Sequence, residues 1–141
     1  MYKKILLPTD GSDYAAEEIK RATDLISEDG EIIVLSVAGK LTSTAFQKRS
    51  SVRKVNEGMY EEAEDNVKQM LNLFDDSANV RGIVEVGFAS EKIIEVSEKE
   101  NCDLIIISST GKSGLHRFIL GSVTEKVLKN SEIDVLLIHN K

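Results

Sequence analysis

The sequence is poor in the residues that build covalent or metal-bound scaffolds. Among its 141 residues it has one cysteine, Cys102, two histidines and no tryptophan. A single cysteine excludes an internal disulfide and a cysteine-rich zinc site. With only two histidines besides it, an all-protein transition-metal site is not expected either. Stability must therefore come from a hydrophobic core, and a chain of this length hides about two-thirds of the surface that its unfolded form exposes.

Long hydrophobic runs and an excess of positive charge are also absent. Apolar runs such as Leu104–Ile107 are far shorter than the roughly 20 residues that cross a bilayer. The segment Met1–Ile5 enters a strand-like run at once, without the pattern of a secretory leader. We therefore expect a cytoplasmic protein with no membrane partner. The net charge of −6 argues against a nucleic-acid partner, because phosphate affinity needs a positive face.

Short apolar runs alternate along the chain with segments of helical periodicity. Apolar runs bounded by turn formers are typical of buried strands, whereas apolar residues three and four positions apart indicate amphipathic helices. Strands are predicted at Ile5–Leu7, Ile32–Leu35, Val80–Val86, Leu104–Ile107 and Val135–Ile138; helices are predicted over Ala15–Ile26 with a stop at Asp29-Gly30, over Val52–Phe74, over Ile93–Asn101 and from Gly121-Ser122 onward.

This order of elements predicts an α/β fold. The strands are continuously apolar and not alternating, which is typical of a parallel sheet covered on both sides. Right-handed crossovers then give a single domain over residues 1–141, an open doubly wound five-stranded parallel sheet with helices on both faces, Rossmann-like and with strand order 3-2-1-4-5. In such sheets the ligand lies at the carboxyl ends of the strands, at the switch in strand order.

Small, hydroxyl-bearing and glycine residues gather at these predicted carboxyl ends. Pro8–Ser12 follows the first strand, Ser108–Gly114 follows the fourth, and a helix begins near Gly121-Ser122. Glycine lets the backbone approach an anion closely, and a helix N-terminus adds unpaired N–H donors. Lys112 and Arg117 add positive charge to the same segment. These features describe a phosphate cradle, although ordinary turns have a similar composition.

Two general phosphate-loop patterns do not fit. The Gly111-Lys112-Ser113 triplet imitates the end of a Walker A loop, but that loop requires a glycine where Ile106 stands. The dinucleotide fingerprint should follow the first strand, where Gly11 is the only one of its three glycines.

A family pattern fits better. The opening Met1–Ser12 and the segment from Ser108 to Val127 resemble the universal stress protein family over essentially the whole chain. Its ATP-binding branch carries Gly-x2-Gly-x9-Gly-[Ser/Thr]. In this chain Gly111 is followed by nine residues and then Gly121-Ser122, so the last elements match, and Ser108 replaces the first glycine.

The resemblance implies a binding site for ATP, ADP or AMP, with Mg²⁺ held through the phosphates and with Asp10 as a candidate carboxylate near it. Lys112 is our own addition, a cation that offsets phosphate charge. The resemblance implies contacts to the adenosine from Pro8, Thr9, Asp10, Val37, Ile107 and Ser108, and contacts to the phosphates from the backbone of Gly111, Gly121, Ser122 and Val123 and from the Ser122 hydroxyl.

The family resemblance predicts an ATP-binding regulator of stress response or signalling. We assign no catalytic residue and expect at most a weak ATPase, because Asp10 is the only acid placed at the strand ends. A nucleotide-free dimeric adaptor and a weak, partner-dependent ATP hydrolase stay open as alternatives, the adaptor because of Ser108. An apolar terminal strand invites pairing with a second copy, and the resemblance implies a homodimer joined through Val135, Leu136, Leu137 and Ile138.

Overall fold

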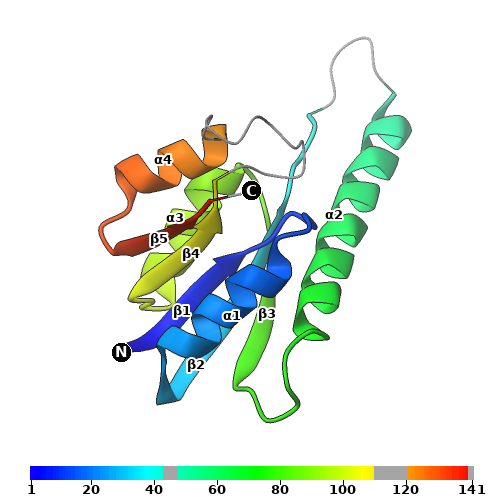
Figure 1. Cartoon of the computed structure of the whole chain (residues 1–141). Helices are drawn as coiled ribbons and strands as arrows, with labels where there is room; N and C mark the ends of the chain where they lie inside the picture. Colours follow the sequence, from blue (N-terminus) through cyan, green and yellow to red (C-terminus); the bar gives the residue numbers. More distant parts are fainter. Residues whose placement is uncertain (43–47, 110–120, 140–141) are drawn as a thin grey trace.

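Five parallel strands form one sheet with helices on both faces (Figure 1). The structure is a computed structural model that describes residues 1–42, 48–109 and 121–139. The strand order is β3-β2-β1-β4-β5, which confirms the predicted doubly wound fold. The elements are β1 (Tyr2–Pro8), α1 (Ala15–Leu25), β2 (Ile26–Ala38), α2 (Arg49–Leu71), β3 (Val80–Val86), α3 (Ala89–Lys99), β4 (Leu104–Ser108), α4 (Ser122–Asn130) and β5 (Asp134–Ile138).

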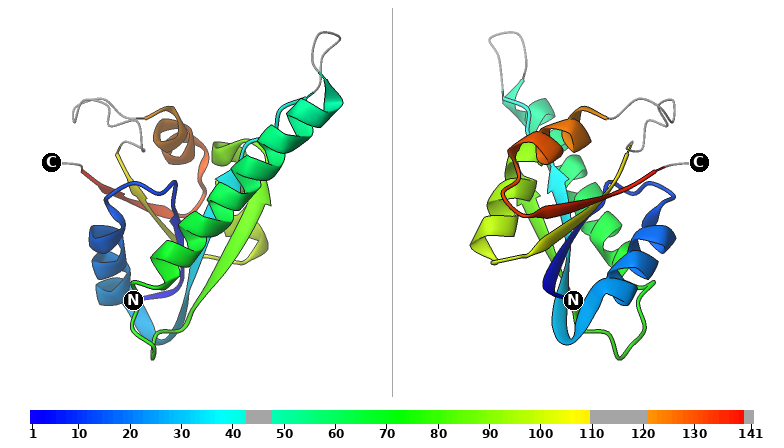
Figure 2. Two further views of the ribbon diagram at one scale, coloured as in Figure 1. Left: turned by 90° about the vertical axis from the view of Figure 1, so that its right-hand side faces the viewer. Right: turned by 60° about the vertical axis from the view of Figure 1, so that its left-hand side comes forward.

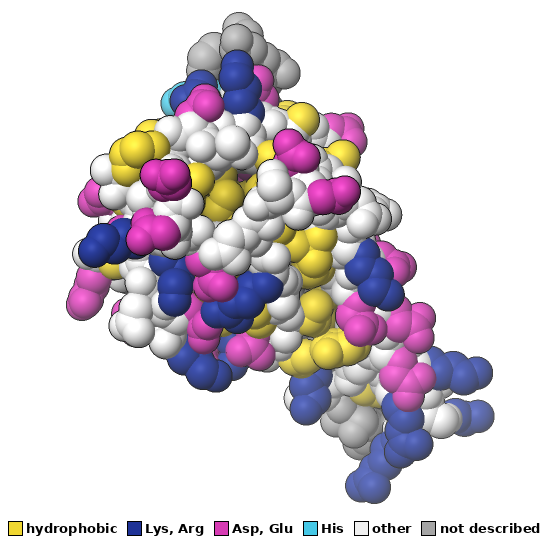
Figure 3. Space-filling model, turned by 90° about the horizontal axis from the view of Figure 1, so that it is seen from below, with side chains coloured by type: hydrophobic (Ala, Val, Ile, Leu, Met, Phe, Trp, Pro, Cys, Tyr) yellow, Lys and Arg dark blue, Asp and Glu magenta, His cyan; other side chains and the backbone are white. Residues whose placement is uncertain are grey.

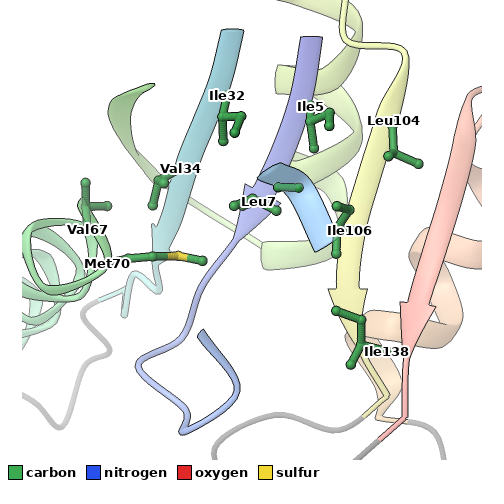
Figure 4. Packing of buried hydrophobic residues seen from close by; sticks show 10 residues of the cluster. Ile5, Leu7, Ile32, Val34, Val67, Met70, Leu104, Ile106 and Ile138 are labelled. Atoms are coloured by element: carbon green, nitrogen blue, oxygen red, sulfur yellow. The ribbon is translucent and has the colours of Figure 1, made fainter. Parts of the chain in front are cut away.

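Successive strand residues point to opposite faces of the sheet, and each face has its own core. Ile5 of β1 pairs with Ile32 and Leu104, and all three side chains lie on one face together with Leu7 and Ile106 (Figure 4). The neighbouring residues point the other way and form a second cluster that contains Leu6, Ile33, Leu35, Ile105 and Ile107. The continuous apolar runs of the sequence are therefore explained by burial on both sides.

The helices divide between these two cores. Ala22 of α1 and Val67 and Met70 of α2 pack on the Ile5 face, where Figure 4 shows the α2 side chains beside β2. Ile93 and Val96 of α3 and Val127 of α4 pack on the opposite face. The two views of Figure 2 show the same division and show that the amino-terminal part of α2 extends past the sheet.

The boundary between the first helix and the second strand differs from the prediction. Helix α1 ends at Leu25, and Ile26 already belongs to β2, so the stop expected at Asp29-Gly30 lies inside the strand. The pairing of β1 with β2 explains the difference, because Tyr2 pairs with Ile26 whereas Lys4 pairs with Glu31. The additional β2 residues between these two pairs form an irregularity in the ladder. The pairing of β1 with β2 therefore outweighs the local turn signal of Asp29-Gly30.

Ion pairs connect the strands near their amino-terminal ends. Arg81 on β3 pairs with Glu31 on β2, with 3.2 Å between Nε and Oε2, and also with Glu100 after α3. Tyr2 donates a hydrogen bond to Asp134 at 2.6 Å, which links β1 to the start of β5. Seen from below, acidic and basic side chains are interspersed over this end of the molecule (Figure 3). Such partly exposed pairs each contribute at most about 1 kcal/mol, so the two cores dominate stability.

Helix α2 packs closely against Gly82 on β3. A Cβ atom added there would lie 2.3 Å from Cγ1 of Val67, a buried residue of α2. Gly58 offers a contrast within α2 itself, because a Cβ atom there would meet nothing within 4 Å.

The same substitution is therefore expected to have opposite effects at these two glycines. Gly82→Ala should lower the free energy of unfolding by about 1–3 kcal/mol, because the added methyl overpacks the contact with Val67. Gly58→Ala should raise it by about 0.5–1 kcal/mol, because alanine favours an exposed helix. Urea titrations of both variants and the wild type measure the two values, and an unchanged Gly82→Ala protein would contradict the described packing.

Candidate functional site at the carboxyl ends of the strands

The loop after β1 forms a tight turn that places Asp10 at the edge of the sheet. The Thr9 amide donates to the Leu35 carbonyl at 2.8 Å, which fastens the loop to β2. The Ser12 amide donates to Oδ1 of Asp10 at 3.1 Å, and the Gly11 amide donates to Oγ1 of Thr9 at 3.2 Å. Gly11 has a φ of +83°, a left-handed conformation that glycine adopts without strain. The Pro-Thr-Asp-Gly-Ser segment therefore fixes an exposed carboxylate beside the ends of β1 and β2.

The end of β4 is connected to the start of α4 by three hydrogen bonds. The Ser109 amide donates to the Ile138 carbonyl of β5 at 2.8 Å, and the Gly121 amide donates to the Ser109 carbonyl at 2.9 Å. The Thr124 hydroxyl donates to the Ser108 carbonyl at 2.8 Å. The first turn of α4 is therefore held directly beside the carboxyl end of β4.

The N-terminus of α4 leaves backbone donors unused. Gly121 is the N-cap residue, with φ −65° and ψ 152°, and as a glycine it has no side chain that could cap the helix. Within the described part of the chain, no group accepts a hydrogen bond from the amides of Ser122 and Val123. Unpaired first-turn amides are typical anion-binding groups. The Gly121 amide, to which the sequence analysis assigns a phosphate contact, already donates a hydrogen bond to the Ser109 carbonyl in this structure.

Three further predicted residues lie on one face of the sheet. Ile107 belongs to the core cluster beneath α3 and α4, and Val37 and Val123 are half-buried against that same cluster. They provide an apolar surface near the ends of β2 and β4. Pro8 and Thr9 are half-buried at the end of β1, the strand that lies between β2 and β4 in the sheet. Gly111 and Lys112 lie outside the described residues.

Two open hollows flank this edge in the described part of the molecule. One, of about 670 Å³, lies between α3 and α4 and is lined by Ser122 and Val123 together with Phe88 and Lys126. The other, of about 890 Å³, lies against the amino-terminal half of α2 and contains none of the predicted site residues. The first hollow therefore borders the unpaired amides of α4.

The structure also reveals a residue that the sequence interpretation missed. Glu18 on α1 is only 4% exposed, and its Oε1 accepts a hydrogen bond from the Ser108 hydroxyl at 3.0 Å. Its other oxygen, Oε2, is buried without a hydrogen-bond partner among the described residues. Burial raises the pKa of Glu18, the Ser108 hydrogen bond lowers it in part, and the negative charge of Asp10 raises it, so that the pKa is about 8. Glu18 is therefore largely protonated at neutral pH.

Helical spacing could have identified Glu18. It lies three residues after Ala15 and four before Ala22, so it falls within the apolar stripe of the first helix. A carboxylate in that stripe is rarely buried without a reason. Its partner Ser108 could not be found in this way, because it is 90 residues away in the sequence.

The described residues contain no group of three or more histidine, cysteine, aspartate or glutamate side chains that could hold a metal ion. A search of the same residues finds no helix long and apolar enough to span a membrane.

Comparisons with known proteins agree with the fold. The sequence profile of the universal stress protein family matches residues 1–139. Universal stress protein MJ0531 of Methanocaldococcus jannaschii is 33% identical over 98% of this chain and 82% of its own length. The solved structure of MJ0577 from the same organism is 34% identical and covers 100% of this chain and 98% of that chain, with a TM-score of 0.84.

A more distant solved structure is that of a universal stress protein in complex with cAMP. It is 22% identical to this chain, covers 98% of this chain and 97% of that chain, and has a TM-score of 0.59. A likeness at this level shows the shared fold.

The buried carboxyl of Glu18 predicts a specific pH dependence of stability. The pKa of Glu18 rises from 4.5 to about 8 on folding, so between these values the unfolded chain releases a proton that the folded chain retains. The contribution of Glu18 to the free energy of unfolding should therefore fall with rising pH across this window, by at most about 1.4 kcal/mol per pH unit. Glu18→Gln should remove this decline.

Urea titrations at about pH 5.5, 7 and 8.5 test this expectation. The exposed neighbour Glu17 provides the control, because Glu17→Gln should leave the wild-type pH profile in place. Parallel profiles for the wild type and Glu18→Gln would show that Glu18 ionises normally in the folded protein.

Proposed function

This chain belongs to the universal stress protein family, and we propose that it binds an adenine nucleotide at the carboxyl ends of β1, β2 and β4. The observation that carries the proposal is the uncapped first turn of α4, whose Ser122 and Val123 amides lack partners among the described residues. That turn lies at the switch in strand order, where α1 and α4 leave neighbouring strands toward opposite faces. Open α/β sheets bind their ligands at this point.

The described side chains are suited to the parts of such a ligand. In this proposal the phosphates meet the amides of Ser122 and Val123, and the adenine packs on Val37 near Ile107. Asp10 accepts a hydrogen bond from the ribose or the adenine edge. A universal stress protein with this fold has been solved in complex with cAMP, which supports an adenine nucleotide as the class of ligand.

In this proposal a magnesium ion enters together with the phosphates. When bound, it would neutralise phosphate charge, and Asp10 is the carboxylate that we assign to its neighbourhood. The family and this site together support a regulator of stress response or signalling whose ligand-bound and ligand-free states present different surfaces.

We also propose a homodimer joined through β5. This strand forms one edge of the sheet, and Val135, Leu136 and Leu137 are half-buried in the single chain. The Ile138 carbonyl accepts a hydrogen bond from the Ser109 amide, so the backbone groups of Ile138 face β4. Because backbone groups alternate in direction along a strand, those of Leu137 and Val135 face the open edge of the sheet. An apolar strand with an open row of backbone groups favours pairing with a second strand.

The Ser122 amide can be removed without disturbing the helix. Ser122 is the first residue of α4, a position that favours proline, and the ψ of 152° at Gly121 suits a residue that precedes proline. Ser122→Pro should therefore weaken ATP binding about ten- to a hundredfold, the effect of losing a charge-assisted hydrogen bond. Ser122→Ala retains the amide and removes only the hydroxyl, so its affinity should stay closer to that of the wild type.

Isothermal titration calorimetry with ATP and Mg²⁺ gives these affinities, and urea midpoints establish that each variant is folded. Equal affinities for Ser122→Pro and the wild type would show that the amide does not contact the ligand. A folded wild-type protein that binds no nucleotide would favour the nucleotide-free adaptor.

The dimer can be tested at the outward row of β5. Val135→Pro removes one outward amide and leaves the groups that face β4, so it should shift the protein from a dimer toward a monomer. Sedimentation equilibrium measures the mass of each form. A wild-type protein that sediments at the protomer mass would contradict the proposed interface.

A further inference from the structure

Ser108 connects the two helices that begin on either side of the site. Its hydroxyl donates to Glu18 of α1 at 3.0 Å, and its carbonyl accepts from the Thr124 hydroxyl of α4 at 2.8 Å. Both bonds are buried. Because α1 and α4 pack on opposite faces, the last residue of β4 is held from both sides. Neither bond belongs to the regular helix or sheet ladders.

The Ser108 side chain lies on the same face of the sheet as Ile106, because side chains alternate along β4, and the Glu18 bond fixes its hydroxyl there. Glu18 reaches it from α1, on the face that carries Ile106. Val37, Ile107 and Val123 pack on the opposite face. The hydroxyl is therefore held away from the apolar surface to which we assign the adenine.

This arrangement explains how a serine can stand where the family pattern has its first glycine. A glycine at that position presents only backbone to a ligand. Ser108 is 7% exposed, and its one hydroxyl proton is already donated to Glu18. Because the Ser108 hydroxyl is bonded to Glu18 on the face that α1 covers, a ligand on the opposite side contacts only the Ser108 backbone, as it would with a glycine at this position.

We propose that Glu18 is a positioning residue of the nucleotide site: by binding the Ser108 hydroxyl on the α1 face, it keeps the end of β4 open to the ligand. This inference rests on the proposed nucleotide binding. Glu18 makes no contact with the ligand and acts only through Ser108.

The protonation of Glu18 matters for an anionic ligand. Among the described residues, the Ser108 hydroxyl from β4 and the Asp10 carboxylate from the turn after β1 act on it. Leu7 of β1, Val34 of β2 and Met70 of α2 belong to the apolar core on the same side of the sheet. A neutral Glu18 adds no repulsion to a bound phosphate, whereas an ionised Glu18 adds a second negative charge beside Asp10.

A double-mutant cycle tests the proposal by calorimetry with ATP and Mg²⁺ at about pH 7. Glu18→Ala frees the Ser108 hydroxyl to rotate about the Cα–Cβ bond toward the open end of β4 and should weaken binding about tenfold. Ser108→Gly should bind as the wild type does or more tightly. The double variant Glu18→Ala with Ser108→Gly should recover to within about twofold of the wild type, because no hydroxyl is left to misplace.

Two controls separate positioning from a general loss of structure. Glu17→Ala changes an exposed glutamate on the same helix and should leave the affinity unchanged. The pH profile adds a second readout: wild-type affinity for ATP should fall as the pH rises through about 8, the pKa of Glu18. The affinity of Glu18→Gln for ATP, and the affinity of the wild type for uncharged adenosine, should stay level over that range.

The outcomes distinguish the two proposals. A wild-type protein that binds no nucleotide overturns both. A wild-type protein that binds ATP, with Glu18→Ala binding equally well, overturns the role of Glu18 and leaves nucleotide binding intact. A loss in Glu18→Ala that Ser108→Gly does not restore also overturns it, because Glu18 would then act by another route.

Discussion

Neighbouring strands β1 and β4 send their helices to opposite faces of the sheet, and this divergence determines where a ligand can bind. Helix α1 joins the core on the Ile5 face, whereas α4 joins the core on the Leu6 face. Among the described elements, no crossover helix then covers the space above the ends of the two strands. The exposed carboxylate of Asp10 and the unpaired amides of Ser122 and Val123 lie at this edge because of that topology.

Because α1 and α4 lie on opposite faces, the last residue of β4 is connected to both helices. Ser108 bonds to Glu18 on one side of the sheet and to Thr124 on the other, so the geometry of the site depends on both helices. The burial of Glu18 raises its pKa and leaves one of its oxygens without a hydrogen-bond partner among the described residues. A buried carboxyl of this kind lowers stability, and its presence beside the candidate site is consistent with a functional role rather than a structural one.

Much of the architecture could be predicted from the sequence because it depends on local patterns. Continuous apolar runs such as Leu104–Ile107 indicated buried parallel strands, and the turn formers around Asp10 and Gly121 indicated the loops at their carboxyl ends. The end of α1 could not be predicted, because the pairing of Tyr2 with Ile26 is a tertiary contact.

The chemistry of individual groups was harder to predict. The bond between Glu18 and Ser108 joins residues far apart in the sequence, and it depends on how α1 is rotated over the sheet. The use of the Gly121 amide by Ser109 depends on where the chain enters α4. Motif spacing locates a site, whereas the hydrogen bonds of the fold decide which of its groups remain available to a ligand.

The most direct test of the account is to identify what the protein carries when it is purified without added nucleotide. The protein is denatured, and the released small molecules are separated by ion exchange and identified by mass. The account predicts an adenine nucleotide in near-stoichiometric amount. A protein that releases no nucleotide, and that also shows no heat of binding with ATP and Mg²⁺, would contradict the assignment of this edge as a nucleotide site.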